Sequence, residues 1–140
     1  MQLILAAVDE SQPAKRAAVL AARLAAQTGA KLLVLNVVEP LWVPPADQTV
    51  NTSALMEELL QFSRNLVRKT AAHLEQPGLA IEPLSVTGSP AITIADLADA
   101  RGADLVVLGS TGTGAVARAL LGSVADRVLR ICTRPVLVVH

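Results

Sequence analysis

The chain has 140 residues, enough for one domain with a sizeable core, and 52% of them are apolar although only one tryptophan and one phenylalanine are present. Twelve basic and twelve acidic residues give zero formal net charge without a long run of either sign, which argues against a nucleic-acid-binding domain. A single cysteine excludes an intrachain disulfide, and the absence of a signal-peptide pattern or a bilayer-spanning segment predicts a soluble cytoplasmic protein without a membrane partner.

Apolar runs of strand length recur along the chain. They show little polar alternation, which is typical of parallel strands covered on both faces. We therefore expect five buried strands, at Leu3 to Val8, Lys31 to Val38, Ala80 to Val86, Asp104 to Leu108 and Pro135 to Val139.

Segments with the 3.6-residue period of a helix lie between these runs. Gly29 is the expected end of the first helix, and Ser89 with Pro90 supplies an N-cap and a first-turn proline for the third. The four segments are marked by Ala17 to Thr28, by Leu55, Leu59, Phe62 and Leu66, by Ser89 to Gly102, and by Leu121, Val124, Ala125, Val128 and Cys132.

This alternation of strands and helices predicts an α/β fold of the Rossmann-like type, with a doubly wound, five-stranded parallel sheet and about four helices. We see no linker and no internal repeat, so residues 1–140 are expected to form a single domain. The one irregular segment is Glu39 to Asn51, in which three prolines forbid regular structure and predict a surface loop after the second strand.

The first candidate site is the loop after the first strand. Asp9 lies where that strand ends, and ligands of open α/β sheets bind beyond the carboxyl ends of the strands. Its carboxylate could accept hydrogen bonds from a ribose or help to hold a divalent ion. Asp9 with Ser11 could equally well only cap the following helix, and the residues alone leave both interpretations open.

The second candidate is the glycine-rich stretch GSTGTGAVARALLGSV, from Gly109 to Val124. Glycine lets backbone N–H groups approach a bulky anion, and a helix that begins near Ser123 would add its unpaired N–H groups and positive dipole end. The alternative is a mobile connection in which Ser123 is an N-cap. A P-loop is excluded because no Gly-Lys-Ser/Thr occurs. A dinucleotide-binding glycine motif is rejected because the strand that follows the stretch is the last of the five, so no second half of the fold remains to hold a nicotinamide.

A longer pattern fits the stretch better. Gly109, Gly112, nine residues and then Gly122-Ser123 resemble the G-x2-G-x9-G-S/T nucleotide signature of the universal stress protein family. VDES, VTGSP, GADLVVLGSTG and LLGSVADRVLR followed by RPVLVV also resemble the family's motifs, in the right order and over nearly the full length.

The resemblance implies a strand order of 3-2-1-4-5, which places the Asp9 loop beside the Gly109 loop, and it implies that ATP lies across that crevice, with Mg²⁺ or Mn²⁺ as a possible companion. It also implies a homodimer joined through Pro135 to Val139, a short apolar strand that would be an exposed edge in a monomer. The resemblance places adenine near Ala7 and Val37, and the ribose near Asp9 and Gly88. It places the phosphates on Gly109, Ser110, Gly112, Gly122, Ser123 and Val124.

The chain departs from the family pattern at three places. Asn36 stands where members often have histidine, and Thr111 where arginine or histidine is common, so a cation that would aid phosphate binding is missing there. The segment Ile131 to Pro135 replaces a frequent HAPCP, remote from the nucleotide.

The other polar residues give weaker indications of a functional site. We expect Cys132 to be a packed thiol, because unpaired cysteine is often buried, and no zinc site at His73 or His140, because no third ligand is near in sequence. Asp126 with Arg127 is expected to be a helix-surface pair, and Asp96, Asp99 and Asp104 to be solvated or capping carboxylates.

Three functions follow in order of preference. The first is an ATP-binding regulatory module, the second an interaction module of the same fold that uses no nucleotide, and the third a slow ATPase or nucleotidyl-transferring relative. No catalytic residue is assigned, because the glycine-rich stretch contains Arg118 as its only cation and no general base, and efficient phosphoryl transfer needs such charge stabilisation.

Overall fold

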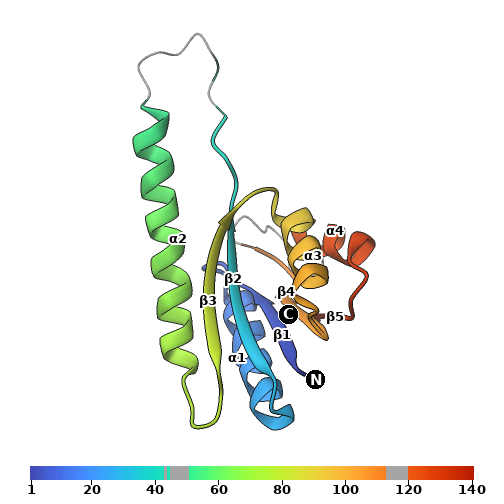
Figure 1. Ribbon diagram of the computed structural model, residues 1–140. Helices are drawn as coiled ribbons and strands as arrows, with labels where there is room; N and C mark the ends of the chain where they lie inside the picture. The colour runs from blue at the N-terminus through green and yellow to red at the C-terminus, as the bar shows by residue number, and fades with distance from the viewer. Residues whose placement is uncertain (43, 45–50, 113–119) are drawn as a thin grey trace.

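The computed structural model describes residues 1–42, 44, 51–112 and 120–140. They form one five-stranded sheet of order β3-β2-β1-β4-β5, in which every neighbouring pair is parallel, and this confirms the predicted fold class and strand order (Figure 1). The strands are β1 (Leu3–Ala7), β2 (Lys31–Val38), β3 (Ile81–Thr87), β4 (Leu105–Gly109) and β5 (Val136–Val139). Each begins and ends within one residue of the range that the apolar runs predict.

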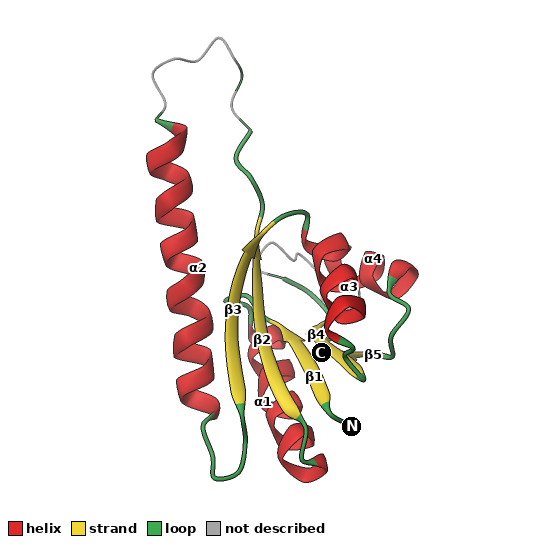
Figure 2. Ribbon diagram, in the orientation of Figure 1, coloured by secondary structure: helices red, strands yellow, loops and turns green. Residues whose placement is uncertain are grey.

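Helices cover both faces of the sheet (Figure 2). One apolar cluster joins the sheet to α1 (Gln12–Thr28) and α2 (Thr52–Leu74), and a second joins it to α3 (Pro90–Arg101) and α4 (Ser123–Ile131). The side chains of a strand alternate between these clusters, as Leu32 and Val34 on one face and Leu33 and Leu35 on the other show. Both faces are buried, which is why the strands read as continuous apolar runs.

The ends of α1 and α3 follow from their capping residues. The Ser11 hydroxyl accepts a hydrogen bond from the N–H of Ala14 at the start of α1, while Gly29 and Gly102 end α1 and α3 in the left-handed conformation. The predicted stop at Gly29 is confirmed. Ser89 occupies the N-cap position of α3, but its side chain makes no capping hydrogen bond.

The apolar stripe that marks α2 in the sequence does not face the core. Leu55, Leu59 and Phe62 are exposed, whereas Ser63 and Val67 are among the buried residues of this helix. Leu55 and Leu59 lie in the N-terminal turns of α2, which extend beyond the sheet in Figure 1. Phe62 lies beside the buried Ser63, so it is exposed because it faces away from the sheet.

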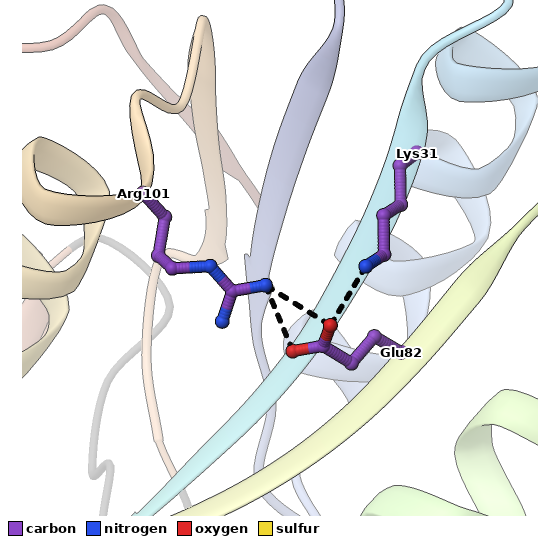
Figure 3. A network of polar contacts seen from close by, with 3 residues as sticks. All are labelled: Lys31, Glu82 and Arg101. Atoms are coloured by element: carbon purple, nitrogen blue, oxygen red, sulfur yellow. Dashed lines mark hydrogen bonds and ion pairs between the residues drawn. The ribbon is translucent and has the colours of Figure 1, made fainter.

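An ion-pair network joins three elements at the amino-terminal end of the sheet (Figure 3). The Glu82 carboxylate on β3 accepts from the Lys31 ammonium on β2 at 2.7 Å and from the Arg101 guanidinium at the end of α3 at 2.9 Å. The hydrogen bond from Lys31, followed by that from Arg101, lowers the pKa of Glu82 below its usual value of 4.5.

Among the described residues, none of the helices is both long enough and apolar enough to cross a lipid bilayer.

Candidate functional site

The strand order brings the two candidate loops together. β1 pairs with both β2 and β4, and Ala7 stands opposite Leu35 on one side and Leu108 on the other. The connections after β1 and β4 diverge to opposite faces, because α1 covers one face and α4 the other. In an open α/β sheet, a ligand-binding crevice is expected where neighbouring connections diverge to opposite faces in this way. The structure has a cavity of about 390 Å³ at this place.

Most of the predicted nucleotide-binding residues line this cavity. It is bounded by the ends of β1, β2 and β4, by the first turns of α3 and α4, and by the start of the glycine-rich stretch. Residues 113–119 of that stretch, Arg118 included, lie outside the described residues, as do 43 and 45–50 of the predicted Glu39 to Asn51 loop. The predicted residues that line the cavity are Ala7, Asp9, Val37, Gly109, Gly112, Gly122, Ser123 and Val124.

Gly88 and Ser110 do not line the cavity. Ser110 is buried, its N–H donates to the Val139 carbonyl at 2.7 Å, and its own carbonyl accepts from the Gly122 N–H at 2.6 Å. Ser110 therefore ties the end of β4 to β5 and to the start of α4. At Gly88 an added Cβ would collide with the Thr93 hydroxyl, so close packing against α3 accounts for this glycine.

Asp9 organises the loop after β1 and also faces the glycine-rich stretch. Its Oδ1 accepts from the Ser11 N–H at 2.8 Å, and the helix cap itself is the Ser11 hydroxyl. Its Oδ2 lies 3.0 Å from the position that a Cβ on Gly112 would occupy. The two interpretations of Asp9 are therefore compatible, because one oxygen stabilises the turn while the other is turned toward Gly112.

The glycines of the stretch have different structural reasons. A Cβ on Gly109 would lie 2.7 Å from the Ala14 nitrogen and 2.8 Å from the Pro13 carbonyl carbon, so β4 and the start of α1 approach too closely for a side chain. A Cβ on Gly122 would lie 3.1 Å from the Ser110 carbonyl oxygen. None of the three glycines that line the cavity has a positive φ angle, so close approach and not backbone conformation selects glycine here.

The start of α4 supplies a potential anion site. Its N-cap is Gly122, with Ser123 the first helical residue, so the alternative interpretation of Ser123 as the N-cap is wrong. Gly122 has no side-chain oxygen that could accept hydrogen bonds from the first-turn N–H groups. The next three residues, Ser123, Val124 and Ala125, all line the cavity. The first N–H groups of a helix lack intrahelical partners and favour negative charge.

Comparison with known proteins identifies the family. The model of the universal stress protein family matches residues 1–140. This chain belongs to that family. A universal stress protein of Thermus aquaticus is 38% identical to it over 141 aligned residues, which cover 98% of this chain and 97% of the relative.

Solved structures of the family have the same fold. The universal stress protein UspA of Lactobacillus plantarum superposes with a TM-score of 0.84 at 30% identity, covering 99% of this chain and 97% of that one. A universal stress protein in complex with cAMP superposes with a TM-score of 0.71 at 27% identity, covering 99% and 97% of the two chains. One from Archaeoglobus fulgidus in complex with dAMP does so with a TM-score of 0.62 at 25% identity, covering 100% and 98%.

Asn36, one of the departures from the family pattern, belongs to a partly buried chain of hydrogen bonds in this universal stress protein. Its amide donates to the Val8 carbonyl at 2.7 Å, and its oxygen accepts from the Ser63 hydroxyl of α2 at 2.6 Å. Ser63 also lies 2.6 Å from the Ser85 hydroxyl on β3 and is only 1% exposed. Our sequence interpretation missed Ser63, although its helical spacing from Leu60 and Val67, three residues before and four residues after it, was the available signal.

Thr111, the other departure near the nucleotide signature, lines the cavity, and its carbonyl accepts from the Ser11 hydroxyl at 3.3 Å. The two loops are thus joined directly. The backbone of Thr111 makes this contact, so the contact does not depend on the Thr111 side chain.

The remaining polar candidates have structural partners. Asp126 pairs with Arg130 at 3.2 Å, one helical turn away, and the expected pairing with Arg127 is wrong. Cys132 is half-buried against the cluster under α3 and α4, in agreement with a packed thiol. In the described part of the chain, no three His, Cys, Asp or Glu side chains gather in a way that could hold a metal ion.

Two carboxylates outside the site tie chain segments together. Asp99 accepts from the Thr133 hydroxyl at 2.6 Å and from Arg134 at 2.9 Å, and these bonds lower its pKa. Asp104 accepts from the N–H groups of Gln2 and Leu3, which lower its pKa in the same way. Both lie away from the cavity, and their roles are structural.

Proposed function

We propose that this universal stress protein binds an adenine nucleotide, ATP in particular, in the cavity beyond β1 and β4, and acts as a nucleotide-dependent regulatory module. The observation that carries the proposal is the convergence of the Asp9 carboxylate and the N-terminus of α4 on one cavity. A nucleotide combines a ribose, which needs hydrogen-bond acceptors, with phosphates, which need N–H donors and positive charge.

The chemistry of the cavity fits such a ligand. Its volume of about 390 Å³ falls in the range of small-molecule sites, and its floor between β1 and β2 is apolar, as an adenine ring requires. Adenine would lie against Ala7 and Val37, the ribose beside Asp9 with Gly88 behind it, and the phosphates along Gly112, Gly122, Ser123 and Val124. Gly109 and Ser110 would support the phosphate loop from below.

The solved complexes of the family support this proposal. The two relatives were captured with cAMP and dAMP, and both ligands contain adenine, a five-carbon sugar and phosphate. The same three parts match the apolar floor, the acidic group and the helix start of this chain. A divalent ion such as Mg²⁺ or Mn²⁺ would be held by the phosphates and Asp9 together.

Thermal and chemical unfolding with and without ATP and Mg²⁺ tests the proposal. Nucleotide at about 100 times its dissociation constant should stabilise the native state by about 2.7 kcal/mol. Asp9→Asn should weaken ATP binding at least tenfold, because an amide NH2 replaces the second carboxylate oxygen that would accept from the ribose, while the remaining oxygen can still accept from the Ser11 N–H. Isothermal titration calorimetry gives the two dissociation constants.

Asp96→Asn is the matched control, because Asp96 is an exposed aspartate of α3 outside the cavity. It should bind ATP as the wild type does. An absence of stabilisation by ATP, ADP, AMP or cAMP at millimolar concentration would contradict nucleotide binding and leave the second candidate, an interaction module of the same fold.

We also propose a homodimer joined through β5. Within the described ranges this strand pairs with β4 alone, which leaves its other edge without a partner strand there, and its residues are half-buried and apolar. An open apolar edge of this kind invites pairing with a second strand. Antiparallel or face-to-face contact of two β5 strands would cover it.

A further inference from the structure

We propose that the groove between α1 and α2 binds an acidic amphipathic helix of a partner protein. The groove has a volume of about 830 Å³ and lies on the face of the sheet that α1 and α2 cover. Its apolar lining includes Val19, Phe62 and Leu66, and its basic lining consists of Lys15, Arg68 and Lys69. The proposal does not depend on nucleotide binding, because none of these six residues lines the cavity beyond β1 and β4.

Two apolar side chains that line the groove are about half exposed to solvent. Phe62, the one phenylalanine of the chain, is 52% exposed, and Val19 across the groove is 51% exposed. Leu55, Leu59, Phe62 and Leu66 recur at intervals of four, three and four residues, so they form one ridge along α2. At 1.5 Å per residue this ridge is about 16 Å long, or three helical turns. Phe62 and Leu66 line the groove, and Leu55 and Leu59 continue the ridge from the groove toward the start of α2. Apolar anchors at this spacing are what an amphipathic helix contacts when it docks in a groove.

No ion pair among the described residues neutralises the basic lining of the groove. The five ion pairs of the described residues involve Lys31, Arg64, Arg101, Arg130 and Arg134. In this described part of the molecule, Lys15, Arg68 and Lys69 pair with no carboxylate, and Glu10 is the one acidic residue that lines the groove. Because the whole chain has zero net charge, this is a local positive excess, and it is complementary to glutamate or aspartate on both flanks of an apolar stripe.

The shape of the surface selects among anionic partners. The apolar lining comes from two neighbouring helices, so a third helix laid between them can contact Val19 of α1 and Phe62 of α2 at the same time. A small anion would use the cations but leave the apolar ridge uncovered. A helix with an apolar stripe and acidic flanks uses both features.

A fluorescently labelled synthetic peptide tests the proposal with the full-length protein. The peptide has about 18 residues, long enough to form a helix, with leucines along one stripe and glutamates beside them. Fluorescence anisotropy should show saturable binding that weakens as salt is raised. Phe62→Ala and Lys69→Glu should each weaken binding at least tenfold, and amide NMR shifts should map to α1 and α2.

The controls separate the groove from general stickiness. Leu129→Ala and Arg127→Glu make the same kinds of change at exposed positions of α4 and should bind the peptide as the wild type does. Circular dichroism checks that all four variants fold. The proposal is overturned if the acidic peptide does not bind, if a scrambled or a lysine-for-glutamate version binds equally well, or if the groove variants bind like the wild type. Binding of oleate or of phosphatidylglycerol vesicles without binding of the peptide would overturn it in favour of a lipid ligand.

Discussion

At the scale of single residues, the glycines of the nucleotide signature serve the packing of the loop before any ligand is present. Gly109 lets β4 pass against the first turn of α1, and Gly122 lets the start of α4 close on the Ser110 carbonyl. Gly112 differs, because among the described residues a Cβ there would meet only the side-chain carboxylate of Asp9, at the tight distance of 3.0 Å. A ligand-binding role and a packing role can therefore be separated by substitution.

Gly109→Ala should destabilise the protein by about 1–3 kcal/mol, because the added methyl group would collide with backbone atoms of Pro13 and Ala14 that cannot move independently. Gly112→Ala is the matched control and should cost much less, since the Asp9 side chain can turn away. Urea unfolding monitored by circular dichroism measures both free energies. Equal losses in the two variants would show that the close approach of β4 and α1 is not what selects Gly109.

At the scale of elements, ionic contacts join the ends of strands and helices that are far apart in sequence. Glu82 ties β2 and β3 to the end of α3, and Asp99 ties α3 to the segment before β5. These groups are partly or largely exposed, so each contributes little at neutral pH. Because their carboxylates have lowered pKa values in the folded state, they stabilise the protein above their unfolded pKa, and this stabilisation is lost as pH falls through the folded pKa.

Glu82→Gln tests this linkage. The variant should be less stable than the wild type at pH 7, by up to about 1 kcal/mol, because the carboxylate is lost from between Lys31 and Arg101. The difference should shrink as the pH is lowered below 4.5, the ordinary pKa of a glutamate, because the wild-type carboxylate then takes up a proton. Unfolding curves at a series of pH values measure it.

Glu58→Gln, at an exposed position of α2, provides the control and should leave the pH dependence of stability unchanged. A difference between wild type and Glu82→Gln that stayed constant into acid would show that the contribution of Glu82 is not electrostatic.

At the scale of the whole molecule, the sheet order determines which loops meet and which edge stays open. β1 lies in the middle, so the Asp9 loop faces the glycine-rich stretch after β4, and the α1–α2 groove lies on the opposite face from α3 and α4. The cavity and the groove can therefore serve two partners without overlap. β5, at the edge, leaves a third surface for a second copy.

Val138→Lys should convert the proposed dimer to a monomer, because a charged side chain on a short apolar edge strand opposes pairing with another strand. Light scattering and sedimentation measure the molar mass. Thr87→Lys, an exposed position on the opposite edge strand β3, should leave the dimer intact. A wild type that is monomeric, or a Val138→Lys variant that remains dimeric, would contradict the β5 interface.

Local chemistry made much of this protein predictable from its sequence. Continuous aliphatic runs can be buried on both faces only in a covered parallel sheet, and Gly29 and Gly102 end helices because glycine adopts the left-handed conformation readily. The spacing of Gly109, Gly112, Gly122 and Ser123 indicated the family, and with it the strand order and the position of the site. These features depend on residues near one another in the chain or on a motif that keeps its spacing.

Tertiary structure decided what depends on residues far apart in sequence. The apolar stripe of α2 predicts a helix, but only the packing of α2 against the sheet determines that Phe62 is exposed while the adjacent Ser63 is buried against Asn36. In the same way, Gly109 reads as part of a phosphate cradle until the start of α1 is seen to occupy the space of its missing side chain. Periodicity reports which face of an element is apolar, whereas burial depends on what the rest of the chain places against that face.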